Sequence, residues 1–273
     1  MCDCKNCSKC KLPYWTERNV DIARYVMTGD FEKAMDIVRL SYPKNKTDIN
    51  PRISSGNNKI GDTMNFSLPA AFSCPMEICR YTCADTDKET FCYAFKDFRY
   101  PTVVYARFIN LWYVRHDLAG LERYLRSSID EELNRREVSK RYHAYGKRLF
   151  DRLHESGDFC SLEYLAMHNR IAEDYKDYMT TYTYTKAFRI LEKFGDVSDG
   201  LKISLSGWKG LTIPENLLAK YPHTIVIKSA KDLPKGFVLC PATGHKSDKM
   251  TCEKCGYKCA LGLNVAFVDH TKG

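Results

Sequence analysis

Hydrophobic residues follow two different spacings along the chain, and each spacing predicts a different kind of element. In residues 17–40 and again in residues 101–145, apolar side chains recur every three to four positions, as in a helix with one buried face. Residues 45–62 lie between these stretches, are rich in Asn, Ser, Lys and Gly, and carry little periodicity. We expect residues 45–62 to form a loop or linker.

From about residue 65 to residue 240, short strand-like segments alternate with helical ones. The predicted strands are 65–70, 148–154, 178–185, 201–205, 224–228 and 236–239. The predicted short helices are 161–174, 186–194 and 213–220. Strands that alternate with helices usually pair in parallel through crossover connections, so we predict an α/β fold, a partial or open (βα) barrel of about six parallel strands. In such folds the chemistry lies at the carboxyl ends of the strands.

The 13 cysteines of the 273-residue chain are segregated along it. Three groups of four lie within residues 2–10, 74–92 and 240–259, and Cys160 stands alone. The first residues have no apolar segment of the kind that directs secretion, and no long apolar run predicts a membrane span. We therefore expect a cytoplasmic protein without a membrane partner, whose thiols stay reduced and bind metal in place of forming disulfides.

The middle cysteine group follows the first strand of the alternating region directly. It comprises Cys74, Cys79, Cys83 and Cys92. Thiolates gathered in one loop are ligands for an iron–sulfur cluster or for zinc. Three cysteine ligands would leave one iron open to a substrate or cofactor, whereas four would close the site.

The two terminal groups are also candidate metal ligands. The C-terminal group comprises Cys240, Cys252, Cys255 and Cys259, with His270 as a further candidate ligand. Its Cys-x2-Cys-Gly step is typical of a metal knuckle, with zinc and iron–sulfur both open. The N-terminal group comprises Cys2, Cys4, Cys7 and Cys10, and either forms a small metal site or belongs to a Lys/Cys-rich tail. The chain thus divides into a Cys-rich arm (1–16), a helical lead-in and linker (17–62), the barrel (63–239) and a Cys-rich metal-binding segment (240–273).

Polar residues follow three consecutive predicted strands and are candidates for binding and catalysis. They are His154, Glu155, Ser156, Gly157 and Asp158 after one strand, Tyr184 and Lys186 at the next, and Ser204 and Ser206 at the third. Of these, Glu155, Asp158 and Lys186 are the candidate catalytic groups. The alternatives are that Ser156 or Asp158 only caps the helix that follows, and that Lys186 faces solvent. Because the net charge is +8, we expect an anionic substrate, such as a nucleotide or nucleic acid.

The order of these motifs resembles that of a phage protein family called gene product eighty-eight. The residues that carry the resemblance are Ser67-Leu68-Pro69-Ala70, Cys74-Pro75, Cys92-Tyr93-Ala94, Asn110, His154 to Phe159, Tyr184-Thr185-Lys186, and Cys252 to Cys255 with Phe267 and His270. The resemblance covers about residues 59–270 and implies a phage origin, hence the host cytoplasm, more firmly than it implies a reaction. The stretch between Cys74 and Cys92 is expanded, which leaves open whether Cys79 or Cys83 is the middle ligand.

A looser likeness, at the level of the fold, is to radical S-adenosylmethionine enzymes. That likeness implies one or two 4Fe–4S clusters, S-adenosylmethionine held by the 154–158 turn, and an electron donor as partner. The cysteine spacing departs from the one usual in those enzymes. The alternative is a zinc-stabilised barrel that binds nucleic acid, or exchanges bases as transglycosylases do with Asp158 or Glu155 as nucleophile. Both readings leave the oligomeric state open.

Overall fold

The computed structural model describes residues 14–44, 49–56, 60–75, 78, 92–138, 148–208, 210–244 and 250–269. Cys2, Cys4, Cys7, Cys10, Cys79, Cys83 and His270, among the predicted metal ligands, lie outside these residues. No helix in the described ranges is long and apolar enough to cross a membrane.

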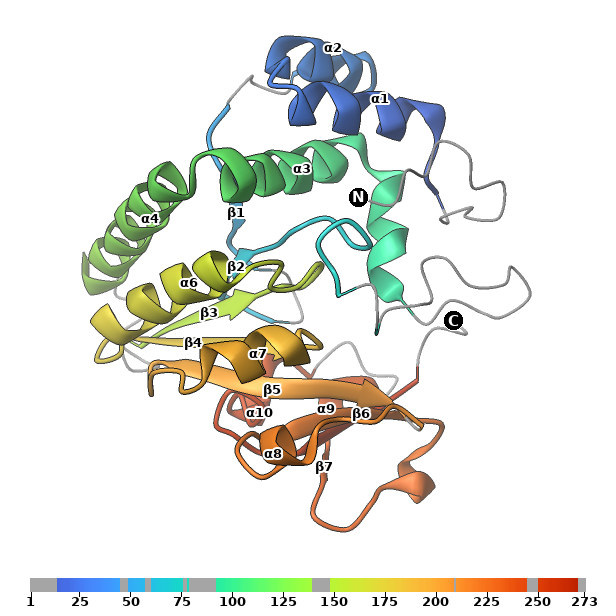
Figure 1. The fold of residues 1–273 in the computed structure, drawn as a ribbon, viewed down its shortest axis with the longest axis vertical. Coiled ribbons are helices and arrows are strands. Elements are labelled where there is room, and N and C mark those ends of the chain that lie inside the picture. The colour runs from blue at the N-terminus through green and yellow to red at the C-terminus, as the bar shows by residue number, and fades with distance from the viewer. Residues whose placement is uncertain are drawn as a thin grey trace.

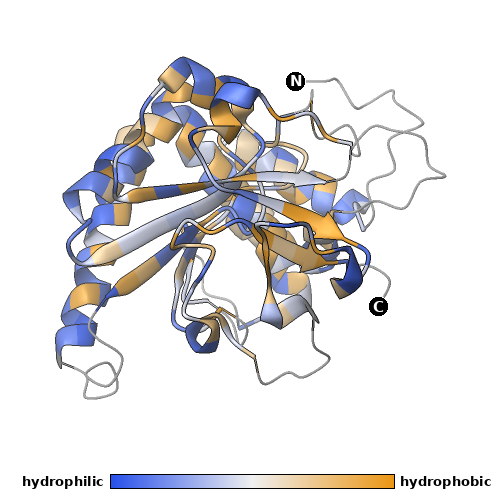
Figure 2. Ribbon diagram, turned by 90° about the horizontal axis from the view of Figure 1, so that it is seen from below, coloured by the Kyte–Doolittle hydropathy of each residue, from blue (hydrophilic) through white to orange (hydrophobic). Residues whose placement is uncertain are grey.

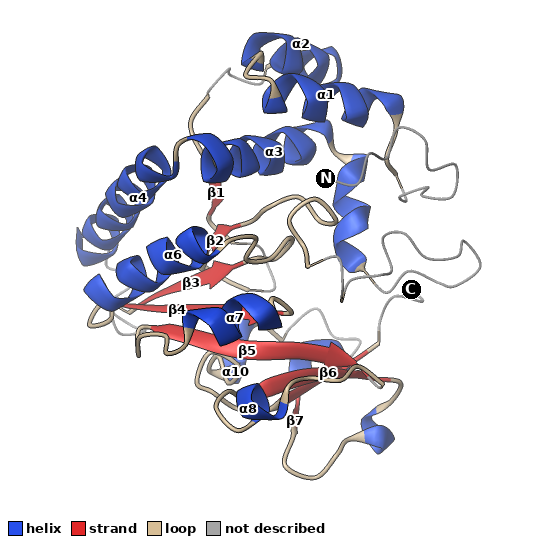
Figure 3. Cartoon of the chain, in the orientation of Figure 1, coloured by secondary structure: helices blue, strands red, loops and turns tan. Residues whose placement is uncertain are grey.

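One eight-stranded sheet forms the centre of the protein (Figures 1 and 3). Its strands are β1 (Ile53–Ser54), β2 (Met64–Phe66), β3 (Leu149–Leu153), β4 (Met179–Thr185), β5 (Leu201–Trp208), β6 (His223–Ile227), β7 (Val238–Leu239) and β8 (Val265–Val268). Their order across the sheet is β1-β2-β3-β4-β5-β6-β8-β7. Every neighbouring pair is parallel except β1 with β2. The carboxyl ends of β2, β3, β4, β5, β6 and β8 therefore meet at one edge.

The α/β class and the parallel pairing predicted from the sequence are confirmed, whereas the prediction of about six strands was too low. The sheet is open, the strand predicted at 236–239 is the short edge strand β7, and the two strands that the prediction lacked are β1 and β8. β1 lies inside the stretch that we expected to be a linker, and it is only two residues long. β8 was not predicted; it enters the sheet between β6 and β7.

Helices cover one face of the sheet. They are α3 (Pro101–His116), α4 (Leu118–Val138), α6 (Leu162–Asp174), α7 (Phe188–Phe194) and α8 (Glu215–Leu218), with the 3-10 helix η2 (Tyr93–Arg99) before α3. The first two helices, α1 (Glu17–Met27) and α2 (Phe31–Ser41), pack on the outside of α3 (Figure 1). The single helical stretches predicted at 17–40 and 101–145 are each two helices, interrupted around Gly29 and Asp117. In Figure 2 these helices carry both hydrophilic and hydrophobic stretches, as expected for elements with one buried face.

The main core lies between this helical layer and the sheet. Residues at odd positions of the central strands point into it, among them Leu149, Leu153, Met179 and Leu205. On the opposite face, which we call the inner face, a second small core joins Tyr182 to Tyr257 and Ala260. The segment that covers the inner face contains α9 (Pro241–Gly244) and α10 (Cys252–Cys255), and it follows the 3-10 helix η3 (Ala230–Asp232) and β7.

The sheet curves towards its inner face. Tyr184 on β4 and Phe267 on β8 meet edge to face, with ring centroids 5.8 Å apart. Two strands, β5 and β6, lie between β4 and β8, so the two strands would be about 14 Å apart in a flat sheet. Side chains on strands this far apart can meet when the sheet is concave on the face that carries them both.

Candidate functional site

The turn at 154–158 continues the pairing of β2 with β3 beyond the carboxyl ends of both strands. The backbone N–H of His154 donates to the carbonyl of Phe66 at 2.9 Å, and the N–H of Leu68 donates to the carbonyl of Ser156 at 2.9 Å. His154 adopts a left-handed φ of 62°, which is unusual for a residue with a side chain. The turn is thereby fixed to the loop that leaves β2.

Gly157 brings this loop and the turn into direct contact. Its φ is +80°, and a Cβ at this position would lie 2.5 Å from Ser73 Oγ and 2.6 Å from Leu68 Cβ. Only glycine fits such a conformation and such a close approach. Because Ser73 immediately precedes Cys74, the first cysteine of the middle group lies beside the polar turn.

Asp158 ties the turn to the end of the next strand. Its carboxylate accepts hydrogen bonds from Thr185 Oγ1 at 2.6 Å, from the Lys186 backbone N–H at 2.7 Å and from the Phe159 N–H at 2.8 Å. Burial raises the pKa of Asp158, and these hydrogen bonds oppose the rise. These contacts favour a positioning role, since they hold the backbone from which the Lys186 side chain extends.

The His154 ring also contacts hydroxyl groups inside the protein. Its ring nitrogens contact Thr183 Oγ1 at 3.3 Å and the Tyr164 hydroxyl at 3.0 Å. Burial lowers the pKa of His154 well below its ordinary value, so the ring is neutral. Ser156 differs from both: it is 3% exposed, and its hydroxyl has no hydrogen-bond partner.

Cys74 and Cys92 are the two described members of the middle group. Both are half-buried, and Cys92 immediately precedes η2. The start of the Cys74 loop is anchored by Asn110 of α3, whose amide donates to the carbonyls of Ser67 and Arg52, each at 2.9 Å. The Arg52 N–H returns a hydrogen bond to the Asn110 side chain at 2.6 Å. Asn110 thus fixes the loop from the helical side.

Polar and aromatic side chains gather on the inner face near the carboxyl edge. Six of them form what we call the inner-face patch: Arg152, Tyr184, Lys186, Ser204, Ser206 and Trp208. The Arg152 guanidinium lies 5.4 Å from the Tyr184 ring centroid, and Lys186 Nζ lies 6.0 Å from that of Trp208. Glu155 forms an ion pair of 3.9 Å with Arg152.

The C-terminal cysteines lie against this same face. Cys240 follows β7, and Cys252 and Cys255 are the first and last residues of α10. These three cysteines and Cys259 are half-buried free thiols. Burial, reinforced by Cys259 and Cys255, raises the pKa of Cys252 to about 12. Tyr184 and Cys259 both pack against the small core of the inner face, which joins the cysteine segment to the inner-face patch. Within the described part of the chain, no three or more His, Cys, Asp or Glu side chains are drawn together as a metal-binding group.

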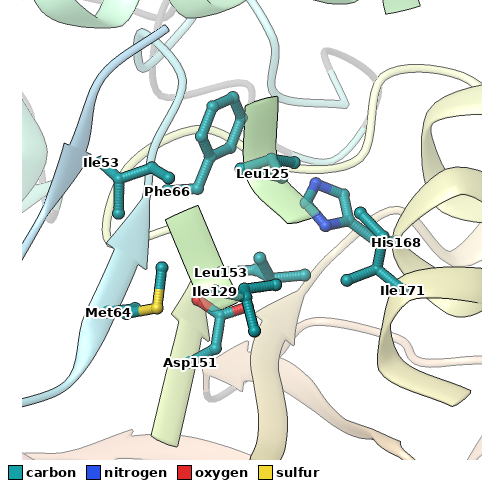
Figure 4. A pocket seen from close by; sticks show the side chains of 9 residues that line it. All are labelled: Ile53, Met64, Phe66, Leu125, Ile129, Asp151, Leu153, His168 and Ile171. Atoms are coloured by element: carbon teal, nitrogen blue, oxygen red, sulfur yellow. The ribbon is translucent and has the colours of Figure 1, made fainter. Parts of the chain in front are cut away.

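Two features of the site were missed by sequence reasoning. Arg152 and Trp208 belong to the inner-face patch, and the alternation of residues along their strands was the signal that could have placed them there. The other feature lies on the helical side, where Asp151 and His168 line a cavity of about 10 Å³ (Figure 4). Such a volume holds one water molecule. Figure 4 shows both side chains among apolar neighbours, including Ile129 and Leu153.

Fold and site together define a mostly parallel α/β protein with a cysteine-bearing loop and a polar turn side by side at the carboxyl edge of its sheet. The family model described as gene product 88 matches residues 40–266. The chain therefore belongs to the gene product 88 family, which confirms the resemblance based on its motifs. No curated protein and no solved structure matches it.

Proposed function

We propose that the protein is an iron–sulfur enzyme of the S-adenosylmethionine-dependent kind, acting on an anionic substrate. The observation that carries the proposal is the contact between two motifs on neighbouring strands. Gly157, in the turn after β3, packs against the residues that lead into Cys74 after β2. A cluster at the cysteine loop and a cofactor held by the turn would therefore be neighbours.

The strand order supports the same proposal. Six parallel strands, β2, β3, β4, β5, β6 and β8, are consecutive neighbours, and the sheet curves away from its helices. We propose that these six strands act as a partial barrel whose inner face receives the substrate. In parallel α/β folds the carboxyl ends of the strands are the usual place for chemistry.

We propose that the middle cysteine group holds the iron–sulfur centre. Cys74 and Cys92 would supply two thiolates and either Cys79 or Cys83 a third, as cysteine ligation of such clusters requires. A 4Fe–4S cluster with one open iron supplies single-electron chemistry and a position for the methionine part of the cofactor. The unpartnered hydroxyl of Ser156 and the half-buried carboxylate of Glu155 are the groups of this chain that would hold the methionine part.

The remaining residues of the site position these groups. Asp158 holds the Lys186 backbone, and neutral His154 fixes the start of the turn through Tyr164. Lys186 extends onto the inner face, where an ammonium group can bind an anionic substrate. An external electron donor completes the list of partners that we propose.

Iron and sulfide analysis of anaerobically purified protein tests the proposal. We expect roughly four iron per bound cluster and broad absorption near about 400 nm. Cys74→Ala and Cys92→Ala should each lose the iron of this site, whereas Cys160→Ala, which removes an exposed cysteine outside the three groups, should retain it. Protein that takes up iron equally in all four forms would contradict the assignment.

One observation favours a second candidate function, a zinc-stabilised protein that binds nucleic acid without radical chemistry. At the end of α10, Gly256 takes a left-handed φ of 71° directly after Cys255, the backbone bend of a metal knuckle. We propose that Cys240, Cys252, Cys255 and Cys259 close around a metal when it is supplied. Zinc alone after anaerobic purification, with nucleic-acid binding that weakens steeply as salt rises, would favour this second function.

A further inference from the structure

We infer that the inner-face patch is a binding site for a nucleoside phosphate. Its role as substrate site rests on the proposed function, but the binding itself can be tested without the iron–sulfur centre. The inference comes from three properties of the patch: its placement on adjacent strands, the pairing of its cations with rings, and a buried hydroxyl without a partner.

The patch is continuous because its members alternate along neighbouring strands. Tyr184 of β4 is the register partner of Ser204 of β5. Two positions further on, Lys186 and Ser206 extend the same rows towards the carboxyl edge. Arg152 reaches the patch from β3 by lying over the Tyr184 ring. A ligand on this face would therefore meet cations, hydroxyls and rings within a few residues of one another.

The two cations of the patch are each paired with an aromatic ring. Arg152 lies over Tyr184, and Lys186 lies near Trp208. Guanidinium and ammonium groups bind phosphate oxygens, and exposed parts of aromatic rings stack with bases, so this combination suits a nucleotide better than a simple carboxylate.

A buried hydroxyl without a partner, that of Ser204, supports a ligand independently of the charges and rings. The Ser204 side chain is 3% exposed, and its hydroxyl has no hydrogen-bond partner. On the same face, Asn65 of β2 is the register partner of Arg152, is also 3% exposed, and has an unpartnered amide nitrogen. Buried polar groups without partners are rare in folded proteins, and a bound molecule is one way in which they are satisfied.

The test is a calorimetric titration of the full chain with each of the four ribonucleoside 5′-monophosphates, and separately with the four ribonucleosides and with inorganic phosphate. At least one monophosphate should bind. Its nucleoside and inorganic phosphate should each bind at least about tenfold more weakly, because each contacts only the rings or only the cations of the patch. Quenching of tryptophan fluorescence should accompany binding and be lost in Trp208→Phe. A 5′-phosphorylated oligonucleotide distinguishes a free nucleotide from one within a strand, and tighter binding of either supports the site.

Matched variants distinguish a loss of binding at the patch from a loss of protein stability. Ser204→Ala should weaken binding about tenfold, the usual size of a lost hydrogen bond to a charged group, without lowering stability. Thr181→Val removes another buried, unpartnered hydroxyl, from the opposite face of β4, and should leave binding unchanged. Cys74→Ala should still bind the nucleotide, so failure of the iron–sulfur proposal and failure of this one give different results. No binding by any monophosphate, or equal binding by the Ser204→Ala and wild-type proteins, overturns the inference.

Discussion

Asp151 is a buried carboxyl group whose ionisation should make the stability of the protein depend on pH. It points from β3 into the helical side of the sheet and is 8% exposed among apolar neighbours. His168 lines the same cavity, and burial lowers its pKa to about 3, so its neutral ring offers Asp151 no compensating charge at neutral pH. Burial raises the pKa of Asp151 from 3.8 to about 7.

The size and sign of the effect follow from that shift. A difference of about three pKa units corresponds to at most about 4 kcal/mol. Because the folded-state pKa is raised, the folded protein holds a proton that the unfolded chain releases between pH 3.8 and about 7. The free energy of unfolding should therefore fall as pH rises through this window and stay level above it, as far as Asp151 is concerned.

Asp151→Asn removes the ionisation while keeping the shape of the side chain. Urea unfolding between pH 4 and pH 8 should show the variant and the wild type close together at pH 4, with the variant more stable by up to about 4 kcal/mol at pH 8. The exposed Asp199→Asn is the control and should show no such divergence. A gap between Asp151→Asn and wild type that does not change with pH would refute the reasoning.

Three further predictions concern the carboxyl edge and the cysteine segment. Gly157→Ala should lower the free energy of unfolding by about 2–4 kcal/mol in urea melts, because of its positive φ and its clash with the Cys74 loop; a change below about 1 kcal/mol would argue against that contact. Asn110→Ala should cost about 2–4 kcal/mol and speed proteolysis before Cys74, since three backbone groups lose their partner; unchanged proteolysis would contradict the anchoring role. Cys255→Ala should abolish metal uptake at the C-terminal segment in competition with a chromophoric chelator while leaving iron at Cys74 intact; an unchanged metal content would remove Cys255 from the ligands.

The strand–helix alternation predicted the α/β class and the parallel order, because each central strand is long enough to show its pattern. The pattern could not reveal β1, which is two residues long, or β8, which lies within a segment read mainly for its cysteines. The breaks at Gly29 and Asp117 were also invisible to periodicity, since apolar spacing continues across both turns. Short strands are placed by their neighbours in the sheet and not by their own sequence.

The position of the polar turn was predictable, but the separate roles of its residues were not. The side chains of His154 and Asp158 form hydrogen bonds with other buried groups of the protein, whereas the Ser156 hydroxyl is buried without a hydrogen-bond partner. Which polar side chains are satisfied depends on neighbours far away in the chain, such as Thr185 and Tyr164. Arg152 escaped notice because it lies within a strand, where only the face to which it points shows what it contacts.

The most direct test of the iron–sulfur proposal is the electron paramagnetic resonance spectrum of the anaerobically purified, dithionite-reduced protein, with and without S-adenosylmethionine. The account predicts a signal of a reduced 4Fe–4S cluster whose g values shift when S-adenosylmethionine is added, and whose shift is absent in Cys74→Ala. A cluster signal that S-adenosylmethionine leaves unchanged, or a protein that holds zinc and no iron, would contradict it.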